Sequence, residues 1–232
     1  VFEKWKAKET PKVTLPETPQ IAGGKIYLIN RPASAQSEIR IGYMGSMVYD
    51  ASGEYYKTQL MNYALGGAFN SRLNLNLRED KGYTYGTRSG FSAGKEPRPF
   101  QAGGGFKADA TAASVLELLY EMNKYSITGI TEEELMFTKN SVGNSDARNY
   151  ETPGQKAGLL GNIVEYGLSA DYVDERKKAR AALTVDEINK LAAKHLRVKD
   201  MAIVIVGDKK IVLEDLEKLY GYEVEIIEMD QL

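Results

Sequence analysis

The first apolar stretches of the chain alternate in the way that β-strands do. Residues 25–30 (KIYLIN) form a short apolar run, and a proline-containing turn separates them from a second run at 37–49. In the second run Ile39, Ile41 and Tyr43 are separated by polar residues or glycine, a period of two that is typical of a half-buried strand. The two runs predict two strands near the start of the fold.

A helical spacing replaces this alternation at about residue 53. Apolar residues then recur at intervals of three and four up to Leu65, and the glycines at 66–67 end the predicted helix. Residues 70–82 are ambiguous, because leucines alternate with asparagines as in a strand, while the charged stretch 78–82 is typical of a helix end. The pattern alone leaves both interpretations open.

The rest of the chain predicts strands on either side of a long helical region. Two strands are predicted at 83–94 and 100–108, around a turn at 97–99 that contains two prolines. The helical region follows them. The last predicted elements are a buried strand at 201–207, a short helix at 211–220 and a strand at 223–227.

Polar residues mark where several of the helices begin. Asp109 or Thr111 can cap the first of them. Thr131 and Thr184 each stand three residues before a glutamate, in the pattern of a capping box. Pro153 suits the first turn of a further helix, because a proline there loses no intrahelical hydrogen bond.

This order of elements predicts an α+β fold in two layers, with one mainly antiparallel β-sheet and helices packed on one face. Prolines and glycines interrupt regular structure in residues 1–24, which we interpret as a lead-in or linker. Residues 25–232 are predicted to form a single domain, long enough to bury a core without a disulfide or a metal.

Composition limits the chemistry that this chain can perform. Its 30 basic and 32 acidic residues give a net charge of −2, which argues against broad electrostatic binding to nucleic acid or to an anionic membrane. The chain has no cysteine, and His195 is its only histidine. Because catalytic zinc usually takes nitrogen or sulfur ligands from two or three side chains, we predict no metal site within this chain.

His195 is the residue on which any Ser-His-Asp triad would depend. It lies on a predicted helix at 185–196, on the same face as Ile188, Leu191 and Ala192. Burial against that apolar stripe, with one ring nitrogen hydrogen-bonded, is the simpler interpretation. Catalysis or metal binding is the alternative, and either role would need partner residues.

Three further clusters have a structural and a functional interpretation. The glycines at 103–105 lack the spacing of a phosphate-binding loop and favour close backbone approach in a strand. The glutamates at 132–134 fit the positive end of a helix dipole better than a cation site. The basic run at 176–180 fits a solvated helix face better than a polyanion site.

Arg78 and Tyr85 are the candidate binding pair. Arg78 closes a short helix if residues 70–82 are helical, and Tyr85 follows a turn at Gly82, where a strand begins. An arginine can donate a bidentate pair of hydrogen bonds to carbonyl or carboxylate oxygens, and a tyrosine hydroxyl can donate to a developing oxyanion. The alternative is that both are ordinary surface residues without a function.

The segment LGGAFNSRLNLNLREDKGYTYG (65–86) resembles a segment of the pitrilysin/insulinase family of zinc metallopeptidases. The resemblance extends to residues 25–45, which look like the opening hairpin of the family, and to the helix start at 131–135. The stretches at 183–196 and 201–208 are similar to its closing helix and strand. The matches follow the order expected for the family.

The resemblance implies that this chain is the non-zinc, inactive half of such a peptidase, with the LuxS/MPP-like metallopeptidase fold. The zinc-bearing unit of the family carries His-x-x-Glu-His on the helix after the first hairpin, whereas the matching helix here, 55–67, has neither the histidines nor the glutamate. The family also implies a helix at 71–78. Arg78 and Tyr85 match its substrate-contacting pair: Arg78 would hold substrate carbonyls and Tyr85 would donate to the oxyanion.

The expected function is therefore substrate binding for peptide hydrolysis at a zinc ion that another domain or subunit holds, with no cofactor in this chain. A non-catalytic structural or interaction module of the same fold is the alternative. The peptide, the oligomeric state and the compartment stay open, with the bacterial periplasm or envelope and the cytoplasm both considered. Because the chain starts at Val1, we expect that a segment is missing ahead of it, either a zinc domain or a cleaved leader.

Overall fold

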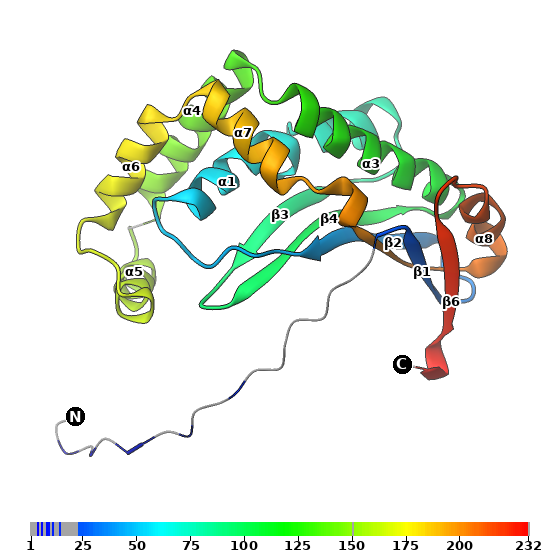
Figure 1. The fold of residues 1–232 in the computed structure, drawn as a ribbon, viewed down its shortest axis with the longest axis horizontal. Helices are drawn as coiled ribbons and strands as arrows, with labels where there is room; N and C mark the ends of the chain where they lie inside the picture. The colour runs from blue at the N-terminus through cyan, green and yellow to red at the C-terminus, as the bar shows by residue number, and fades with distance from the viewer. Residues whose placement is uncertain are drawn as a thin grey trace.

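The computed structural model describes residues 23–149 and 151–231, together with residues 4, 6, 8, 9, 11 and 14. The lead-in predicted for residues 1–24 lies mostly outside the described residues. The strands of the described part (Figure 1) are β1 (Lys25–Asn30), β2 (Gln36–Met44), β3 (Arg88–Ala93), β4 (Pro97–Lys107), β5 (Ala202–Gly207) and β6 (Glu223–Glu228). Its helices are α1 (Glu54–Asn62), α2 (Arg72–Asn74), α3 (Thr111–Thr128), α4 (Glu132–Arg148), α5 (Pro153–Tyr166), α6 (Tyr172–Ala182), α7 (Val185–His195) and α8 (Lys209–Glu217).

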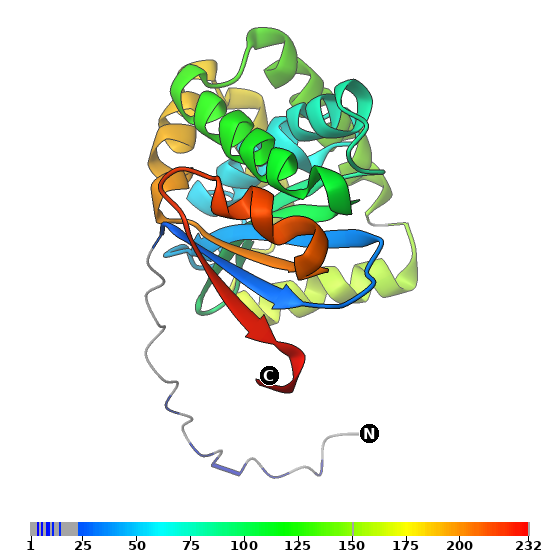
Figure 2. The ribbon, with the colours of Figure 1, turned by 90° about the vertical axis from the view of Figure 1, so that its right-hand side faces the viewer.

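The strands form one six-stranded sheet in the order β3-β4-β2-β5-β1-β6. β2 pairs antiparallel with β4 and β5, and β3 pairs antiparallel with β4. β1 pairs parallel with β5 and β6. The mainly antiparallel sheet and the helices above it confirm the predicted α+β class (Figures 1 and 2).

The opening hairpin expected for residues 25–45 is wrong. β5 lies between β1 and β2 and pairs with both of them, so that the two strands are not neighbours. A short turn can join strands that are not adjacent, because sequential strands are neighbours in only about two thirds of cases. The apolar run of β5 is buried most completely when a strand covers each of its edges, and this favours the central place.

Helices cover one face of the sheet, where the core lies. α3 packs against α7 and α8, and α1 packs against α7 and β3. α5 stands apart from this layer, beyond the end of the β3–β4 hairpin (Figure 1), and none of its residues is buried. The largest fully buried side chains are Tyr125, Phe100, Phe106, Ile26, Leu28, Ile39, Ile41, Leu60, Met61, Leu65, Leu73 and Leu77.

Within the ambiguous stretch 70–82, residues 72–80 are helical, which agrees with the helix that the family resemblance implies at 71–78. α2 continues without a break into a π-helical stretch, Leu75–Asp80. Leu73 and Leu77 are fully buried, whereas Leu75 between them is 51% exposed. A spacing of four places both buried leucines on one helix face, so the leucine–asparagine alternation is not a strand signal here.

The predicted helix starts are correct in three cases. Thr131 and Thr184 form capping boxes with the glutamates three residues on, and Pro153 occupies the first turn of α5. The cap predicted at Asp109 or Thr111 is wrong, because Ala110 precedes α3 and no side chain caps that end. The Thr111 hydroxyl instead donates back to the Ala108 carbonyl at 2.7 Å, within a short 3₁₀ turn.

The turn predicted at 97–99 is also misplaced, because β4 already begins at Pro97 and the chain turns just before it. A proline at the first residue of a strand removes no hydrogen bond that the sheet needs. The pairing of β3 with β4 shifts in register between Phe91 and Ala93, and the residues of β4 that β3 leaves unpaired at this irregularity include the second proline, Pro99. In the described part of the chain, no helix has both the length and the apolar character needed to cross a membrane.

Candidate functional site

The backbone on either side of Tyr85 is held in place, although its side chain is 89% exposed. The Thr84 hydroxyl is 2.6 Å from the Gly105 carbonyl oxygen and 2.9 Å from that of Gly86. Thr84 also forms an isolated antiparallel bridge with Phe106 of β4. The phenol of Tyr85 therefore projects into solvent from a fixed position on the sheet.

Arg78 lies on the π-helical stretch that continues α2, and its guanidinium is held on two sides. It stacks over the ring of Phe69, with the guanidinium carbon 4.4 Å from the ring centroid. It also forms an ion pair with Glu79. Arginine on an aromatic face keeps its edge donors available, so a substrate carbonyl can still accept from Arg78.

A backbone contact brings the Arg78 and Tyr85 segments together. The Tyr83 N–H donates to the Leu77 carbonyl oxygen at 2.9 Å, and Gly82 makes the turn between them with a φ of 63°. A left-handed φ of this kind favours glycine, which explains why Gly82 stands at this turn. The turn at Gly82 reverses the chain, so that Tyr85 lies near Arg78 although the two are seven residues apart in the sequence.

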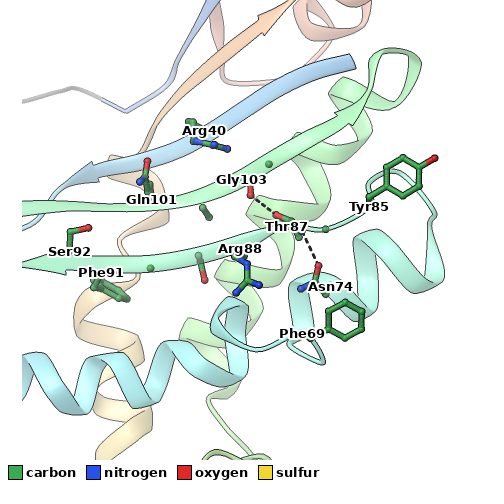
Figure 3. A pocket seen from close by; sticks show the side chains of 15 residues that line it. Arg40, Phe69, Asn74, Tyr85, Thr87, Arg88, Phe91, Ser92, Gln101 and Gly103 are labelled. Atoms are coloured by element: carbon green, nitrogen blue, oxygen red, sulfur yellow. Dashed lines mark hydrogen bonds between the residues drawn. The ribbon is translucent and has the colours of Figure 1, made fainter. Parts of the chain in front are cut away.

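Arg78 and Tyr85 line one cavity of about 270 Å³. Lys107 and Gln36 line it as well. Tyr85 also borders a larger hollow of about 560 Å³ on β3 and β4, shown in Figure 3 together with Phe69, Arg88 and Arg40. The structure thus brings the two predicted residues to a common cavity, and Tyr85 borders the hollow as well.

His195 is buried at the end of α7, as predicted. Its ring nitrogen Nε2 lies 2.7 Å from Oε1 of Glu54, at the start of α1. Burial lowers the pKa of His195, and the neighbouring Glu54 carboxylate opposes this shift in part. The imidazole ties α7 to α1 on the core side of the molecule, which is a structural role.

The residues of this chain do not fit a zinc site. In the part of the chain that the structure describes, no three His, Cys, Asp or Glu residues lie close enough together to hold a metal ion. His195 and Glu54 contact each other, but Glu54 is also bound by Lys194 at 2.7 Å.

The glutamates at 132–134 lie in the first turn of α4, as predicted. Glu134 also accepts two hydrogen bonds from the guanidinium of Arg72, a contact that the sequence did not indicate. The prediction of a solvated face for residues 176–180 is wrong in part. Arg180 forms an ion pair with Asp146 in which both side chains are nearly buried, at 12% and 10% exposure.

The sequence also missed residues that border the site. Phe69 is 59% exposed and stacks on Arg78, and Arg88 lies on the larger hollow beside Tyr85. An aromatic residue two positions after the glycine pair at 66–67 was the one available signal for Phe69. The position of Arg88 depends on strand pairing, which the local pattern did not give. As predicted for 103–105, Gly103 lies in close backbone approach, because a Cβ there would be 1.9 Å from the Ile39 carbonyl oxygen.

The fold and the site together define a two-layer α+β domain with an Arg–Tyr surface and, over its described residues, no metal-binding cluster. A family model described as the Peptidase M16 inactive domain matches residues 1–142. The chain belongs to this family, which confirms the relationship inferred from residues 65–86.

Solved and curated relatives are consistent with this assignment. The crystal structure of a peptidase M16 inactive domain from Pseudomonas fluorescens has a TM-score of 0.75 and 27% identity, over 86% of this chain and 47% of that one. The "Non-peptidase homolog YmxG" of Helicobacter pylori is 26% identical over 70% of this chain and 38% of its own length. The "Uncharacterized zinc protease YmxG" of Bacillus subtilis is 26% identical over 88% of this chain and 49% of its own length. The chain thus spans about half or less of the length of these curated relatives.

Proposed function

We propose that this chain is the substrate-binding, non-zinc half of a pitrilysin-like zinc metallopeptidase, and that Arg78 and Tyr85 are its contribution to peptide hydrolysis. The observation that carries the proposal is the common cavity of the two residues, with the Tyr85 phenol exposed on an anchored backbone. In this proposal another domain or subunit supplies the zinc ion and its ligands, since this chain has a single histidine and no cysteine.

Each residue of the pair has a separate task. The guanidinium of Arg78, held against Phe69, donates to carbonyl oxygens of the peptide backbone and fixes the register of the substrate. The hydroxyl of Tyr85 donates to the oxygen that becomes negative when the peptide carbonyl is attacked. Because both groups lie at the surface, a facing domain can complete the site without a rearrangement of this one.

The test uses this chain together with its zinc-bearing partner. Tyr85→Phe should lower kcat on the order of 10²–10³-fold, as the loss of one oxyanion donor does in other enzymes, with the zinc content unchanged. Arg78→Ala should raise KM as well. Tyr220→Phe is the matched control, because Tyr220 is fully exposed at the end of α8 and lines none of the site cavities.

The outcome separates two functions. Turnover of Tyr85→Phe equal to that of Tyr220→Phe would remove Tyr85 from the chemistry. Unchanged activity in Arg78→Ala as well would favour the second candidate, a structural or interaction module without a role in proteolysis. The relative from Helicobacter pylori whose name describes a non-peptidase homolog is the observation that supports this second candidate.

A further inference from the structure

The exposed face of the sheet is hollowed beside Tyr85. The hollow measures about 560 Å³, and Gly86, Gly90, Gly103 and Gly104 are among the residues that line it. No atom lies within 4 Å of the position that a Cβ on Gly90 would occupy. Because Gly90 carries no side chain and no neighbour fills that space, an incoming group can approach the backbone of the sheet directly at this position.

An arginine lies on each side of Gly103 in the sheet. Arg88 of β3 and Arg40 of β2 are both paired in register with Gly103 of β4, which lies between them (Figure 3). Paired residues on adjacent antiparallel strands are about 5 Å apart, so the two arginine Cα atoms are separated by about 10 Å. Gly103 carries no side chain between these two positions.

The two arginines differ in how far their charge is already neutralised. Arg40 forms an ion pair with Glu38 and donates to the Ile39 carbonyl oxygen at 3.1 Å. The Arg88 guanidinium donates a long hydrogen bond of 3.4 Å to the Gly67 carbonyl oxygen. Among the described residues no carboxylate lies within ion-pair distance of the Arg88 guanidinium. Of the two arginines, Arg88 therefore has more guanidinium N–H groups available to bind a ligand.

The positive charge continues around Tyr85. Lys107 and Arg78 line the neighbouring cavity, where Glu79, already paired with Arg78, is the carboxylate among the lining residues. The chain as a whole carries a net charge of −2, so this concentration of cations is local. A surface of this kind attracts anionic groups and repels cationic ones.

We propose that the hollow is a subsite for an acidic side chain of the peptide, Asp or Glu, with the fork of Arg88 as the donor to its carboxylate. An arginine binds a carboxylate through two parallel hydrogen bonds, which selects a planar anion over a neutral amide. This assignment rests on the proposed function, because it presumes that a peptide lies across Tyr85. It adds a substrate class, peptides with an acidic residue close to the scissile bond.

The experiment measures binding of this chain to matched peptides by fluorescence anisotropy. Two labelled ten-residue peptides differ only by Glu or Gln at one central position. The Glu peptide should bind about tenfold more tightly, which is the low end for charge-assisted hydrogen bonds. In Arg88→Gln this ratio should fall to about one, and Arg88→Lys, which keeps the charge without the fork, should give an intermediate value.

Arg148→Gln is the matched control, since it removes the same charge at the end of α4 and should keep the ratio of the wild-type chain. Thermal melting of each variant shows that it is folded. Equal affinity of the wild type for both peptides overturns the acidic subsite and leaves the proposed function standing, because peptide still binds. A ratio that persists in Arg88→Gln overturns the role of Arg88. If neither the Glu peptide nor the Gln peptide binds, both the proposed function and the subsite are overturned.

Discussion

Replacement of Arg72 by methionine should destabilise the domain far more than the loss of an ordinary surface ion pair. The Arg72 guanidinium donates to both carboxylate oxygens of Glu134, at 2.6 and 2.7 Å, and to the Gly129 carbonyl oxygen at 2.9 Å. It also lies 4.6 Å from the ring centroid of buried Tyr125. These contacts fix the start of α2, and with it the helix that carries Arg78, to the start of α4.

The magnitude follows from the burial of the pair. The side chains of Arg72 and Glu134 are 16% and 28% exposed, so neither charge is fully solvated. Breaking a buried pair by removal of one partner costs about 3–5 kcal/mol, and partial exposure places this case near the lower limit. We expect a loss of about 3 kcal/mol, which for a chain of this length lowers Tm by about 6–12 °C. Methionine keeps most of the apolar stem, so the loss reports mainly the polar contacts.

The assay is urea unfolding of Arg72→Met, Glu134→Gln and the double variant. Glutamine at 134 preserves the capping box, and the cycle should give a coupling energy of about 1–3 kcal/mol. Lys190→Met is the matched control, because the Lys190–Asp186 pair is about three-quarters exposed on both sides and should be worth under about 0.5 kcal/mol. An Arg72→Met loss no larger than that of Lys190→Met would refute the reasoning.

The pH dependence of the same variant gives an independent check. Burial by itself would raise the pKa of Glu134, but hydrogen bonds from Arg72 and the Thr131 backbone, with the charge of Arg72, hold that pKa below its ordinary value of 4.5. A carboxyl with a lowered folded-state pKa contributes stability that is present above its unfolded-state pKa and is lost as the pH falls through the folded-state pKa. The difference in stability between the wild type and Arg72→Met should therefore shrink below about pH 4.5.

Two further outcomes follow from buried groups. Because burial lowers the pKa of His195, the folded state resists protonation, and the free energy of unfolding should fall as the pH drops below the ordinary value of 6.5. His195→Gln should flatten this slope below pH 6.5, and an unchanged slope would contradict the assignment. Gly103→Ala should cost about 2 kcal/mol or more in urea unfolding, because φ is 149° and the new Cβ would meet a carbonyl oxygen at 1.9 Å. Gly90→Ala, which meets no neighbour within 4 Å, should stay within about 1 kcal/mol of the wild type, and equal losses in both would exclude backbone approach as the cause.

Local signals in the sequence were sufficient for most of the elements. The capping boxes at Thr131 and Thr184 involve residues three apart, so the helix starts are encoded within one turn. The burial of His195 followed from its place on an apolar helix face. The helix at 72–80 needed the family resemblance, because Leu73 and Leu77 satisfy a period of two and a period of four equally well.

Long-range pairing is the part that the sequence could not provide. The order of β1 and β2 depends on β5, a strand about 160 residues further along the chain, as the register of Ile39 with Ile205 illustrates. The Arg72–Glu134 pair and the opposition of Arg40 and Arg88 across Gly103 depend on the same tertiary arrangement. No periodicity within one segment contains that information, and so the candidate pair was predictable while its surroundings were not.

The site gains its rigidity from one buried amide that joins its separate parts. The Asn74 side chain on α2 accepts from the Thr87 N–H at 2.9 Å and donates to the Ala68 carbonyl oxygen at 3.3 Å. The Thr87 hydroxyl in turn donates to the Gly103 carbonyl oxygen at 2.9 Å. The loop before Phe69, the helix that leads to Arg78, the backbone after Tyr85 and the Gly103 position of β4 are therefore coupled by three buried hydrogen bonds. If a peptide binds here, as proposed, a surface held by these bonds would lose little conformational entropy on binding, which is the physical advantage of a preformed site over a flexible one.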